Sequence, residues 1–278
     1  MRYTILILLY NKGVGLSKTI NSLYGVNDKH FHDINLIIWN NGPSKIQLDL
    51  NGDFIKKWNR VELVEMIDNM PLSHVYNYII ETYPAERYIF LDDDSKLTNE
   101  YFIAIIDSNA GVAVPAILSH GEYRSPTVSG KFNPGPYQVT DKVIAIGSGI
   151  GMSHDIAKKI KNHYGDVFDS RFALYGVDTT FFLRIHQFGL SDQVEMIDGF
   201  EHSLSRLENE SQAISQFRQV ERAYDLGLTL RHYVPWPQVL FILLKQTVKF
   251  ALGKVSWLQL KIFIKAYKDG CHPKCINR

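Results

Sequence analysis

The chain has 278 residues, of which 45% are hydrophobic and 12% aromatic, and its formal net charge is +1. This composition supports a substantial buried core and excludes an intrinsically disordered chain. The only two cysteines, Cys271 and Cys275, exclude a disulfide framework and indicate a reducing compartment. With His272 between them they are a weak zinc motif, and an ordinary terminal segment is the alternative.

The first apolar run, TILILLY at residues 4–10, predicts a buried strand. It has no small-residue cleavage site and polar residues follow it directly, so a secretion signal is disfavoured. Strand-like runs at residues 34–39 and 87–91 then alternate with helix-like stretches at 15–25 and 71–83. This alternation predicts an α/β fold, in which a mainly parallel, Rossmann-like sheet carries helices on both faces.

Polar residues follow each of the three predicted strands. They are Tyr10, Asn11 and Lys12 after the first strand, Asn40, Asn41 and Gly42 after the second, and Asp92, Asp93 and Asp94 after the third. Ligands of open α/β sheets bind beyond the carboxyl ends of the strands. We therefore expect these three clusters to converge on one edge of the sheet.

The segment at residues 111–146 is rich in Gly, Pro, Ser and Tyr, which predicts a loop-rich, partly antiparallel section that covers the site. Three glycines follow, at positions 147, 149 and 151. They allow either a close backbone approach to a ligand or a tight turn. Apolar residues at helical spacing then predict a helix that begins just after Asp178, which makes a simple N-cap one explanation of that residue.

Three adjacent carboxylates repel one another unless a cation faces them. A helix cap by Asp94 or Thr98 would explain only one of the three. Hard oxygen ligands suit Mg²⁺ or Mn²⁺, so Asp92 to Asp94 predict a divalent metal site.

Two other phosphate-binding motifs fit poorly. A haloacid dehalogenase-type phosphatase requires Thr or Val where this chain has Lys96, and its motif follows the first strand. A P-loop requires glycines where this chain has Lys12 and Ser17.

Five segments resemble, in order, family 2 glycosyltransferases of the GT-A fold, and most closely the rhamnosyltransferase-like members that build bacterial surface polysaccharides. The segments are TILILLYNKGVGLSKTINSL, IIWNNGP, NMPLSHVYNYII, FLDDDS, and the pair GSGIGMS and FDSRFALYGVDTTFFLR. The resemblance covers residues 3–206. It implies a GT-A catalytic domain at 1–207, with a nucleotide-sugar-binding half at 1–105 and an acceptor-side half at 106–207, followed by a helical extension at 208–278.

The resemblance also implies roles for individual residues. Asp94 matches the direct ligand of a Mg²⁺ or Mn²⁺ that bridges the donor diphosphate, and Asp92 lies near the ribose or the metal. Asp178 matches the general base of an inverting transfer. His202 completes the metal shell or contacts the diphosphate, with Arg206 as its partner, and a structural histidine is the alternative. The residues expected around the nucleotide sugar are Tyr10, Asn11, Asn40, Asn69, Asn77, Asp92, Asp93 and Arg206.

Two positions depart from the family pattern. Asn40 stands where an aspartate usually contacts the base, which leaves the donor open between dTDP-rhamnose and a UDP-sugar. Val177 replaces the glutamate of the usual Glu-Asp pair, which leaves Asp178 as the base. Two alternatives stay open: a non-catalytic nucleotide- or sugar-binding protein, and a metal-dependent nucleotidyltransferase, for which the basic residues of the first loop, Lys12 and Lys18, are few.

The last 70 residues predict helices, with a break at Pro235 and Pro237. Between Leu226 and Lys268 there are seven basic residues and no acidic one. Such helices suit an anionic membrane surface, where a glycan or lipid-linked acceptor would lie, and packing on the catalytic domain is the alternative. We expect a cytoplasmic enzyme, peripheral on the inner face of the cell membrane. No nucleic-acid-binding module is recognisable.

Overall fold

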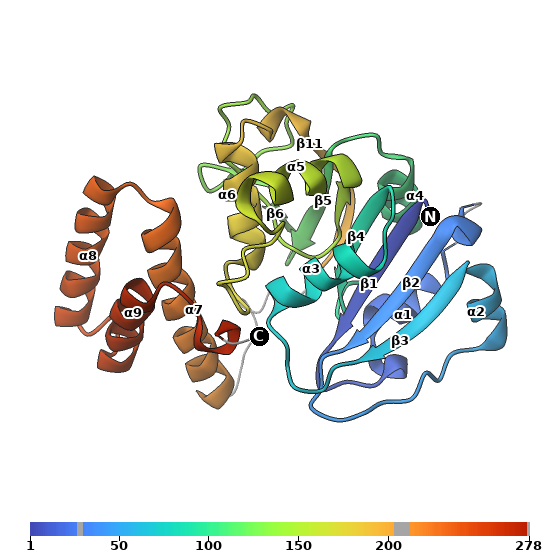
Figure 1. Cartoon of the computed structure of the whole chain (residues 1–278), viewed down its shortest axis with the longest axis horizontal. Coiled ribbons are helices and arrows are strands. Elements are labelled where there is room, and N and C mark those ends of the chain that lie inside the picture. Colours follow the sequence, from blue (N-terminus) through green and yellow to red (C-terminus); the bar gives the residue numbers. More distant parts are fainter. Residues whose placement is uncertain (27–29, 203–211, 277–278) are drawn as a thin grey trace.

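A computed structural model describes residues 1–26, 30–202 and 212–276 of the chain. A central sheet is covered on both faces by helices, and three further helices lie beside it (Figure 1). The strands are β1 (Tyr3–Leu9), β2 (Ile34–Asn40), β3 (Arg60–Glu65), β4 (Arg87–Asp92), β5 (Val112–Ser119), β6 (Glu122–Ser125), β7 (Thr127–Val128), β8 (Lys131–Phe132), β9 (Val143–Ile144), β10 (Ile150–Ser153) and β11 (Val194–Glu201).

The α-helices are α1 (Lys18–Leu23), α2 (Gly52–Lys57), α3 (Leu72–Thr82), α4 (Asn99–Asp107), α5 (His154–Tyr164), α6 (Val177–Gln187), α7 (Gln212–Tyr233), α8 (Trp236–Ala251) and α9 (Trp257–Asp269). Short 3₁₀ helices are η1 (Val14–Leu16), η2 (Phe31–Asp33), η3 (Ser191–Gln193) and η4 (Pro273–Cys275). No helix of the described residues is both long and apolar enough to cross a membrane.

The main sheet has eight strands in the order β11-β5-β10-β4-β1-β2-β3, with β6 paired to β5. The pairs β1–β2, β1–β4, β2–β3 and β5–β11 are parallel, whereas β10 runs antiparallel to both β4 and β5. A small antiparallel sheet, β8-β7-β9, lies apart from it. The predicted α/β class is therefore confirmed.

Alternate residues of β1 enter different cores, as the two-residue period of a strand requires. Leu6 packs in a cluster with Val75 of α3 and Phe181 of α6. Ile7 packs in a second cluster, on the other face, with Ile20 of α1 and residues of α2 and α4. Figure 1 shows α3 in front of the sheet and α1 behind it.

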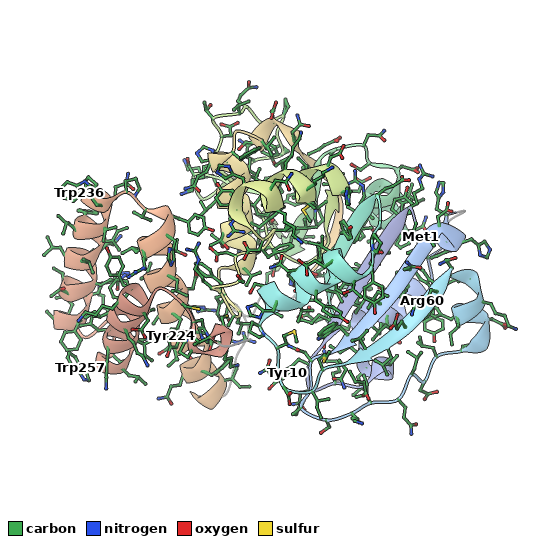
Figure 2. The ribbon with its side chains drawn as sticks, viewed as in Figure 1. Met1, Tyr10, Arg60, Tyr224, Trp236 and Trp257 are labelled. Atoms are coloured by element: carbon green, nitrogen blue, oxygen red, sulfur yellow. The ribbon has the colours of Figure 1, made fainter. Side chains whose placement is uncertain are left out.

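The parallel register brings the three polar clusters to one edge of the sheet, as predicted. Leu9 of β1 is paired with Asn40 at the end of β2, and Leu8 is paired with Asp92 at the end of β4. Tyr10, which follows β1, lies at this carboxyl edge (Figure 2).

The prediction for residues 111–146 is wrong in its first part. Val112 and Val114 are fully buried in β5, a strand of the main sheet. The alternation of valine and alanine at residues 112–114 is typical of a strand. It is too short to predict one, because Pro115 interrupts it and the glycines and prolines that follow indicate loops. The remainder of the segment forms short antiparallel strands, as expected.

Gly149 lies in a turn directly before β10 and has a positive φ of +85°, as the tight-turn alternative expects, whereas Gly151 lies within β10. A Cβ atom on Gly149 would stand 2.8 Å from the Phe200 ring. A Cβ atom on Gly151 would stand 2.5 Å from Ile105 Cδ1. The close approach that these glycines permit is therefore to side chains of the protein itself.

The helical extension breaks where predicted: Pro235 precedes α8 and Pro237 lies in its first turn. Helices α7 and α9 pack on each other and on the part of the molecule that contains the main sheet, since Leu228 of α7 and Ala266 of α9 belong to its core. A polar contact joins the two parts as well, because Tyr233 Oη accepts from Arg184 Nε at 3.0 Å. The expected boundary at 207–208 lies outside the described residues.

Candidate active site

The acidic turn, residues 92–95, begins where β4 ends. Thr98 caps α4 by accepting a hydrogen bond from the Tyr101 N–H. Asp94 is thus not needed as the helix cap, which leaves its carboxylate available for another role.

Asp92, Asp94 and His202 converge at this edge of the sheet. One ligand atom of each lies within 4.8 Å of the others, and this is the one group in the described part of the chain that could hold a metal ion. Asp94 Oδ1 is 3.5 Å from His202 Nδ1. It is buried without a hydrogen-bond partner among the described residues, a costly arrangement unless a cation faces it. Two carboxylates and one imidazole fit a divalent cation.

The environment of Asp92 supports the same conclusion. The pKa of Asp92 is raised to about 7. The largest cause is burial, and the negative charges of Asp94, Asp93 and Asp178 add to it. A bound cation would reverse this shift, because it favours the ionised form.

A chain of hydroxyl groups orients the histidine. Ser95 Oγ lies 3.1 Å from His202 Nδ1 and 2.9 Å from Ser148 Oγ. Ser148 Oγ in turn accepts from the Asp92 N–H at 3.1 Å. His202 follows directly after β11 and Ser148 lies just before β10, so these hydroxyl groups link the ends of β4 and β11 to the start of β10.

Asp93 is not among the candidate metal ligands and is paired with a lysine. Lys12 Nζ lies 2.9 Å from Asp93 Oδ1. Burial raises the pKa of Asp93, and the hydrogen bond and charge of Lys12 oppose that rise. The three consecutive aspartates therefore divide: two form the candidate metal site and one holds the loop after β1.

Asp178 lies in the first turn of α6, but it is not the N-cap; the cap is Gly176, which has no side chain to donate or accept. The N-cap explanation is therefore wrong. The Thr179 N–H donates to Asp178 Oδ1 at 2.7 Å and the Gly147 N–H donates to Asp178 Oδ2 at 3.1 Å. Burial raises the pKa of Asp178, and these backbone hydrogen bonds oppose it. The result is an oriented carboxylate that is a better proton acceptor than a solvated one.

The remaining predicted residues divide into exposed and structural ones. Tyr10 is 49% exposed, and Asn11 beside it has a positive φ of 52°. Asn40 is buried, and its amide donates to Ser44 O at 2.8 Å. Its place at the end of β2 is as predicted, but its side chain supports the following turn.

The two asparagines of the predicted donor segment also differ. Asn69 has a positive φ of 50°, and its Oδ1 lies 3.4 Å from Asn41 Nδ2. Asn77 donates to Phe168 O at 2.7 Å and accepts from the Phe168 N–H at 3.0 Å. It therefore ties α3 to the segment that precedes α6. Arg206 lies outside the described residues.

Thr19 is a residue of the site that sequence reasoning missed. Its Oγ1 donates to Asp92 O at 2.5 Å and accepts from the Ser95 N–H at 3.0 Å. Ser95 and Ser148 were missed as well. The only local signal for them was hydroxyl side chains next to the acidic and glycine-rich motifs.

The terminal cysteines do not form a metal site in the described residues. Burial raises the pKa of Cys275 to about 12, so its thiol stays protonated. His272 Nε2 instead lies 3.4 Å from Glu221 Oε2 on α7. This contact attaches the segment after α9 to α7.

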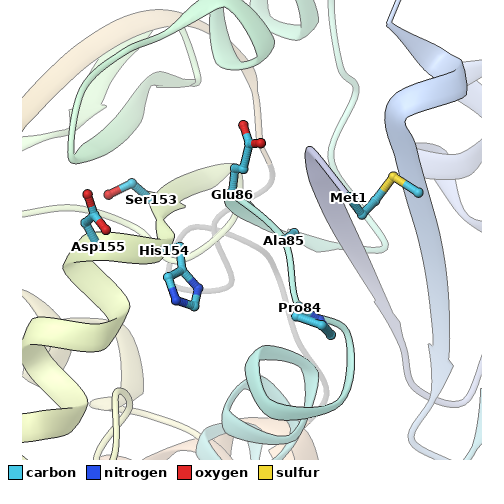
Figure 3. Close-up of a pocket in the computed structure, with 7 residues that line it drawn as sticks. All are labelled: Met1, Pro84, Ala85, Glu86, Ser153, His154 and Asp155. Carbon is cyan, nitrogen blue, oxygen red and sulfur yellow. The ribbon is translucent and has the colours of Figure 1, made fainter.

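A surface depression lies at the opposite, amino edge of the sheet (Figure 3). It is lined by Met1, Pro84, Ala85, Glu86, Ser153, His154 and Asp155. Glu86 and Ser153 flank the start of β4 and the end of the antiparallel β10, on the side away from the acidic turn. None of the candidate catalytic or metal-binding residues lines it.

No protein family model matches the chain, and no curated protein sequence matches it either. The fold does match solved structures. The crystal structure of S. aureus TarS superposes on 99% of this chain with a TM-score of 0.57 and 13% sequence identity; the match spans 50% of the TarS chain.

Two complexes with ligands give similar matches. S. aureus TarS 1-349 with UDP-GlcNAc matches 97% of this chain and 80% of its own, with a TM-score of 0.52 and 14% identity. GalNAc-T7 with UDP, GalNAc and Mn²⁺ matches 84% of this chain and 52% of its own, with a TM-score of 0.53 and 12% identity. At these identities the likeness establishes the fold, which is the GT-A fold of glycosyltransferases.

Proposed function

We propose that the protein is an inverting, metal-dependent glycosyltransferase that moves a sugar from a nucleotide-diphosphate sugar to a hydroxyl group. The observation that carries the proposal is the position of Asp92, Asp94 and His202 at the carboxyl edge of a GT-A sheet, with Asp94 Oδ1 buried and without a hydrogen bond from the part of the chain that the structure describes. This is the edge where open α/β folds bind their ligands.

Asp94, Asp92 and His202 would hold the ion. Mn²⁺ is favoured over Mg²⁺, because Mg²⁺ is usually bound through oxygen ligands alone. The ion would supply Lewis-acid neutralisation of the charge on the departing nucleotide diphosphate. The hydroxyl chain through Ser95 would keep the His202 ring in place, as hydrogen bonds commonly do for histidines that bind metals.

Asp178 would act as the general base. Its two oxygen atoms are oriented by the Gly147 and Thr179 N–H groups, and burial raises its pKa. It would accept the proton of the acceptor hydroxyl as that oxygen attacks the anomeric carbon from the face opposite the leaving group, so the configuration inverts. The preceding position, a glutamate in the usual Glu-Asp pair, is the buried Val177. Asp178 is therefore the acidic residue of this turn that can act as the base.

The donor and acceptor follow from the resemblance of the sequence. We propose a family 2 enzyme of the rhamnosyltransferase-like type, with dTDP-rhamnose or a UDP-sugar as donor, that acts on a glycan or lipid-linked acceptor in surface polysaccharide synthesis. Matches to TarS with UDP-GlcNAc and to GalNAc-T7 with UDP support a nucleotide-sugar donor. The exposed ring of Tyr10, at the carboxyl edge of the sheet, would stack on the nucleotide base.

The test is calorimetric titration of dTDP, UDP, GDP and their sugars into the protein, with Mn²⁺ and with chelator. We expect one nucleotide to bind with Mn²⁺ only, and Asp94→Asn to abolish this binding. Asp155→Asn, an exposed aspartate on α5, is the control. Nucleotide binding that ignores both the metal and Asp94, or no nucleotide binding at all, would refute the proposal.

A further inference from the structure

The outward face of α8 is an apolar surface that no element of the described residues covers. It consists of Trp236, Leu240, Phe241, Leu244, Val248 and, directly after the helix, Leu252. Trp236 is 73% exposed, Phe241 68% and Leu244 64%. Five of them recur every four positions from Trp236 to Leu252, and Phe241 precedes Leu244 by three positions, so all six lie along one side of the helix. We name this set the α8 face.

The opposite side of α8 is already covered. Val239 is buried, and Ile242 and Leu243 pack with it against residues of α7 and α9. The helix is therefore apolar on two sides, of which the protein itself uses one. Exposed apolar surfaces of this extent mark an interaction site in a soluble protein.

The segment that contains the α8 face carries charge of a single sign. No acidic residue occurs between Leu226 and Lys268, and seven basic residues do. Lys245 is exposed next to Leu244, and the exposed side of α9 carries Lys261, Lys265 and Lys268. On α9 these lysines share that side with Trp257, which is 65% exposed.

The two tryptophans mark the extent of this surface. Figure 2 places Trp236 and Trp257 at the two ends of α8, both on the outer margin of the molecule. Helix α8 is itself the element farthest from the sheet in this view (Figure 1). Nothing in the described chain therefore lies between the α8 face and a large external surface.

We infer that the α8 face, together with the exposed lysines of α9, docks on an anionic lipid surface with α8 lying in the plane of the interface. Apolar side chains would enter the boundary between headgroups and acyl chains, lysines would meet anionic headgroups, and tryptophan is favoured at that depth. The inference rests on the extension alone and is independent of the sugar chemistry.

A second copy of the chain fits the same surface less well. A symmetric contact places the same patch on both partners, so lysines of one copy would face lysines of the other. Residues 226–268 offer no carboxylate to separate these charges. Anionic headgroups supply the missing negative charge, which favours lipid over self-association.

The test is co-sedimentation of the full chain with sucrose-loaded vesicles, without nucleotide. Vesicles are made of phosphatidylcholine alone or of phosphatidylcholine and phosphatidylglycerol in equal parts. We expect sedimentation with the anionic vesicles only. Phe241→Ser with Leu244→Ser should lower the partition coefficient at least roughly tenfold. Lys261→Gln with Lys265→Gln should lower it roughly tenfold at low salt.

Matched variants control for surface changes elsewhere. Ile103→Ser removes an apolar side chain that is 38% exposed on α4, and Lys158→Gln with Lys159→Gln removes two exposed charges from α5. Both should bind vesicles as the wild type does. The inference is overturned if anionic vesicles do not sediment the protein, if neutral vesicles do so equally, or if the α8 variants bind unchanged. It is also overturned if the wild type is a dimer by analytical ultracentrifugation and Phe241→Ser with Leu244→Ser makes it monomeric without affecting lipid binding.

Discussion

Thr19 and Ser95 lie 76 positions apart in the chain and are joined by a hydrogen bond of 3.0 Å from the Ser95 N–H to Thr19 Oγ1. The same hydroxyl donates to Asp92 O. One fully buried side chain of α1 thus bonds both ends of the acidic turn. Thr19 therefore ties α1 to the backbone of the turn that carries Asp92 and Asp94.

Replacing Thr19 by valine keeps the shape of the side chain and removes both hydrogen bonds. The Asp92 carbonyl and the Ser95 N–H would be left unsatisfied, so we expect the free energy of unfolding to fall by about 2–4 kcal/mol. Urea unfolding without metal measures this change. Thr19→Ser retains the hydroxyl and should recover most of the loss. A valine variant as stable as the wild type would show that the turn holds its shape without Thr19.

Replacing Asp178 by asparagine keeps the size of the side chain and removes the proton acceptor. Sugar transfer should fall by about 10²–10⁴-fold, the usual contribution of a general base, with nucleotide affinity unchanged. Transfer rates are measured with the donor that calorimetry identifies, and nucleotide affinity is measured by the calorimetric titration itself. The two measurements separate an effect on catalysis from an effect on donor binding. Asp155→Asn is the matched control. It changes an acid in the first turn of α5, which has 11 residues like α6, and it should keep full activity. Full activity of the Asp178 variant would favour a non-catalytic binding protein.

Gly176 caps α6 in a left-handed conformation, with a φ of +84°. A Cβ atom there would lie 2.3 Å from Asp225 Oδ1 on α7 and 2.7 Å from Phe172 Cδ1. We expect Gly176→Ala to lower the free energy of unfolding by more than about 2 kcal/mol, the sum of backbone strain and overpacking.

Gly165 is the matched control for this variant. It has a φ of +90°, and nothing lies within 4 Å of its ideal Cβ position. Gly165→Ala should therefore show the backbone cost alone, about 1 kcal/mol. Equal losses in the two alanine variants, measured by urea unfolding, would mean that α7 does not restrict the turn that carries Asp178.

We expect His232, which joins α7 to Arg171 and Gly270, to make the stability of the fold depend on pH. Its Nδ1 lies 2.8 Å from Arg171 Nη1, which can only donate, and its Nε2 lies 2.8 Å from Gly270 O. The neutral ring with the proton on Nε2 satisfies both contacts. Burial, the largest cause, and the charges of Arg171 and Arg231 lower the pKa of His232, against the hydrogen bond to Gly270 and the charge of Asp169.

Because this pKa is lower in the folded state, the unfolded chain takes up the proton first as the pH falls. Stability should therefore decrease below pH 6.5, by up to about 1.4 kcal/mol per pH unit for this one group. Urea unfolding between about pH 7.5 and pH 5.5 measures the slope. His232→Gln should reduce it, and His163→Gln, an exposed histidine on α5, should not. An unchanged slope in His232→Gln would contradict this assignment.

The sequence alone determined the class of the fold and the edge of the sheet where chemistry is expected. Apolar runs of strand length, separated by helical spacing, require crossovers, and crossovers bring the carboxyl ends of parallel strands to one side. The convergence of Tyr10, Asn40 and Asp92 follows from this rule. The helical extension, its break at Pro235 and the purely basic charge of residues 226–268 could also be predicted, because each is a local property of composition or of proline.

Only the tertiary structure decided which residues meet. Within the acidic turn, Asp94 faces His202 while Asp93 faces Lys12, and no local pattern distinguishes three adjacent aspartates. The Ser95–His202 contact spans 107 positions. Likewise, the buried and the open sides of α8 are both apolar, so periodicity could not tell which one α9 covers. Side-chain pattern fixes the face on which a residue lies, whereas its partner depends on how distant segments pack against that face.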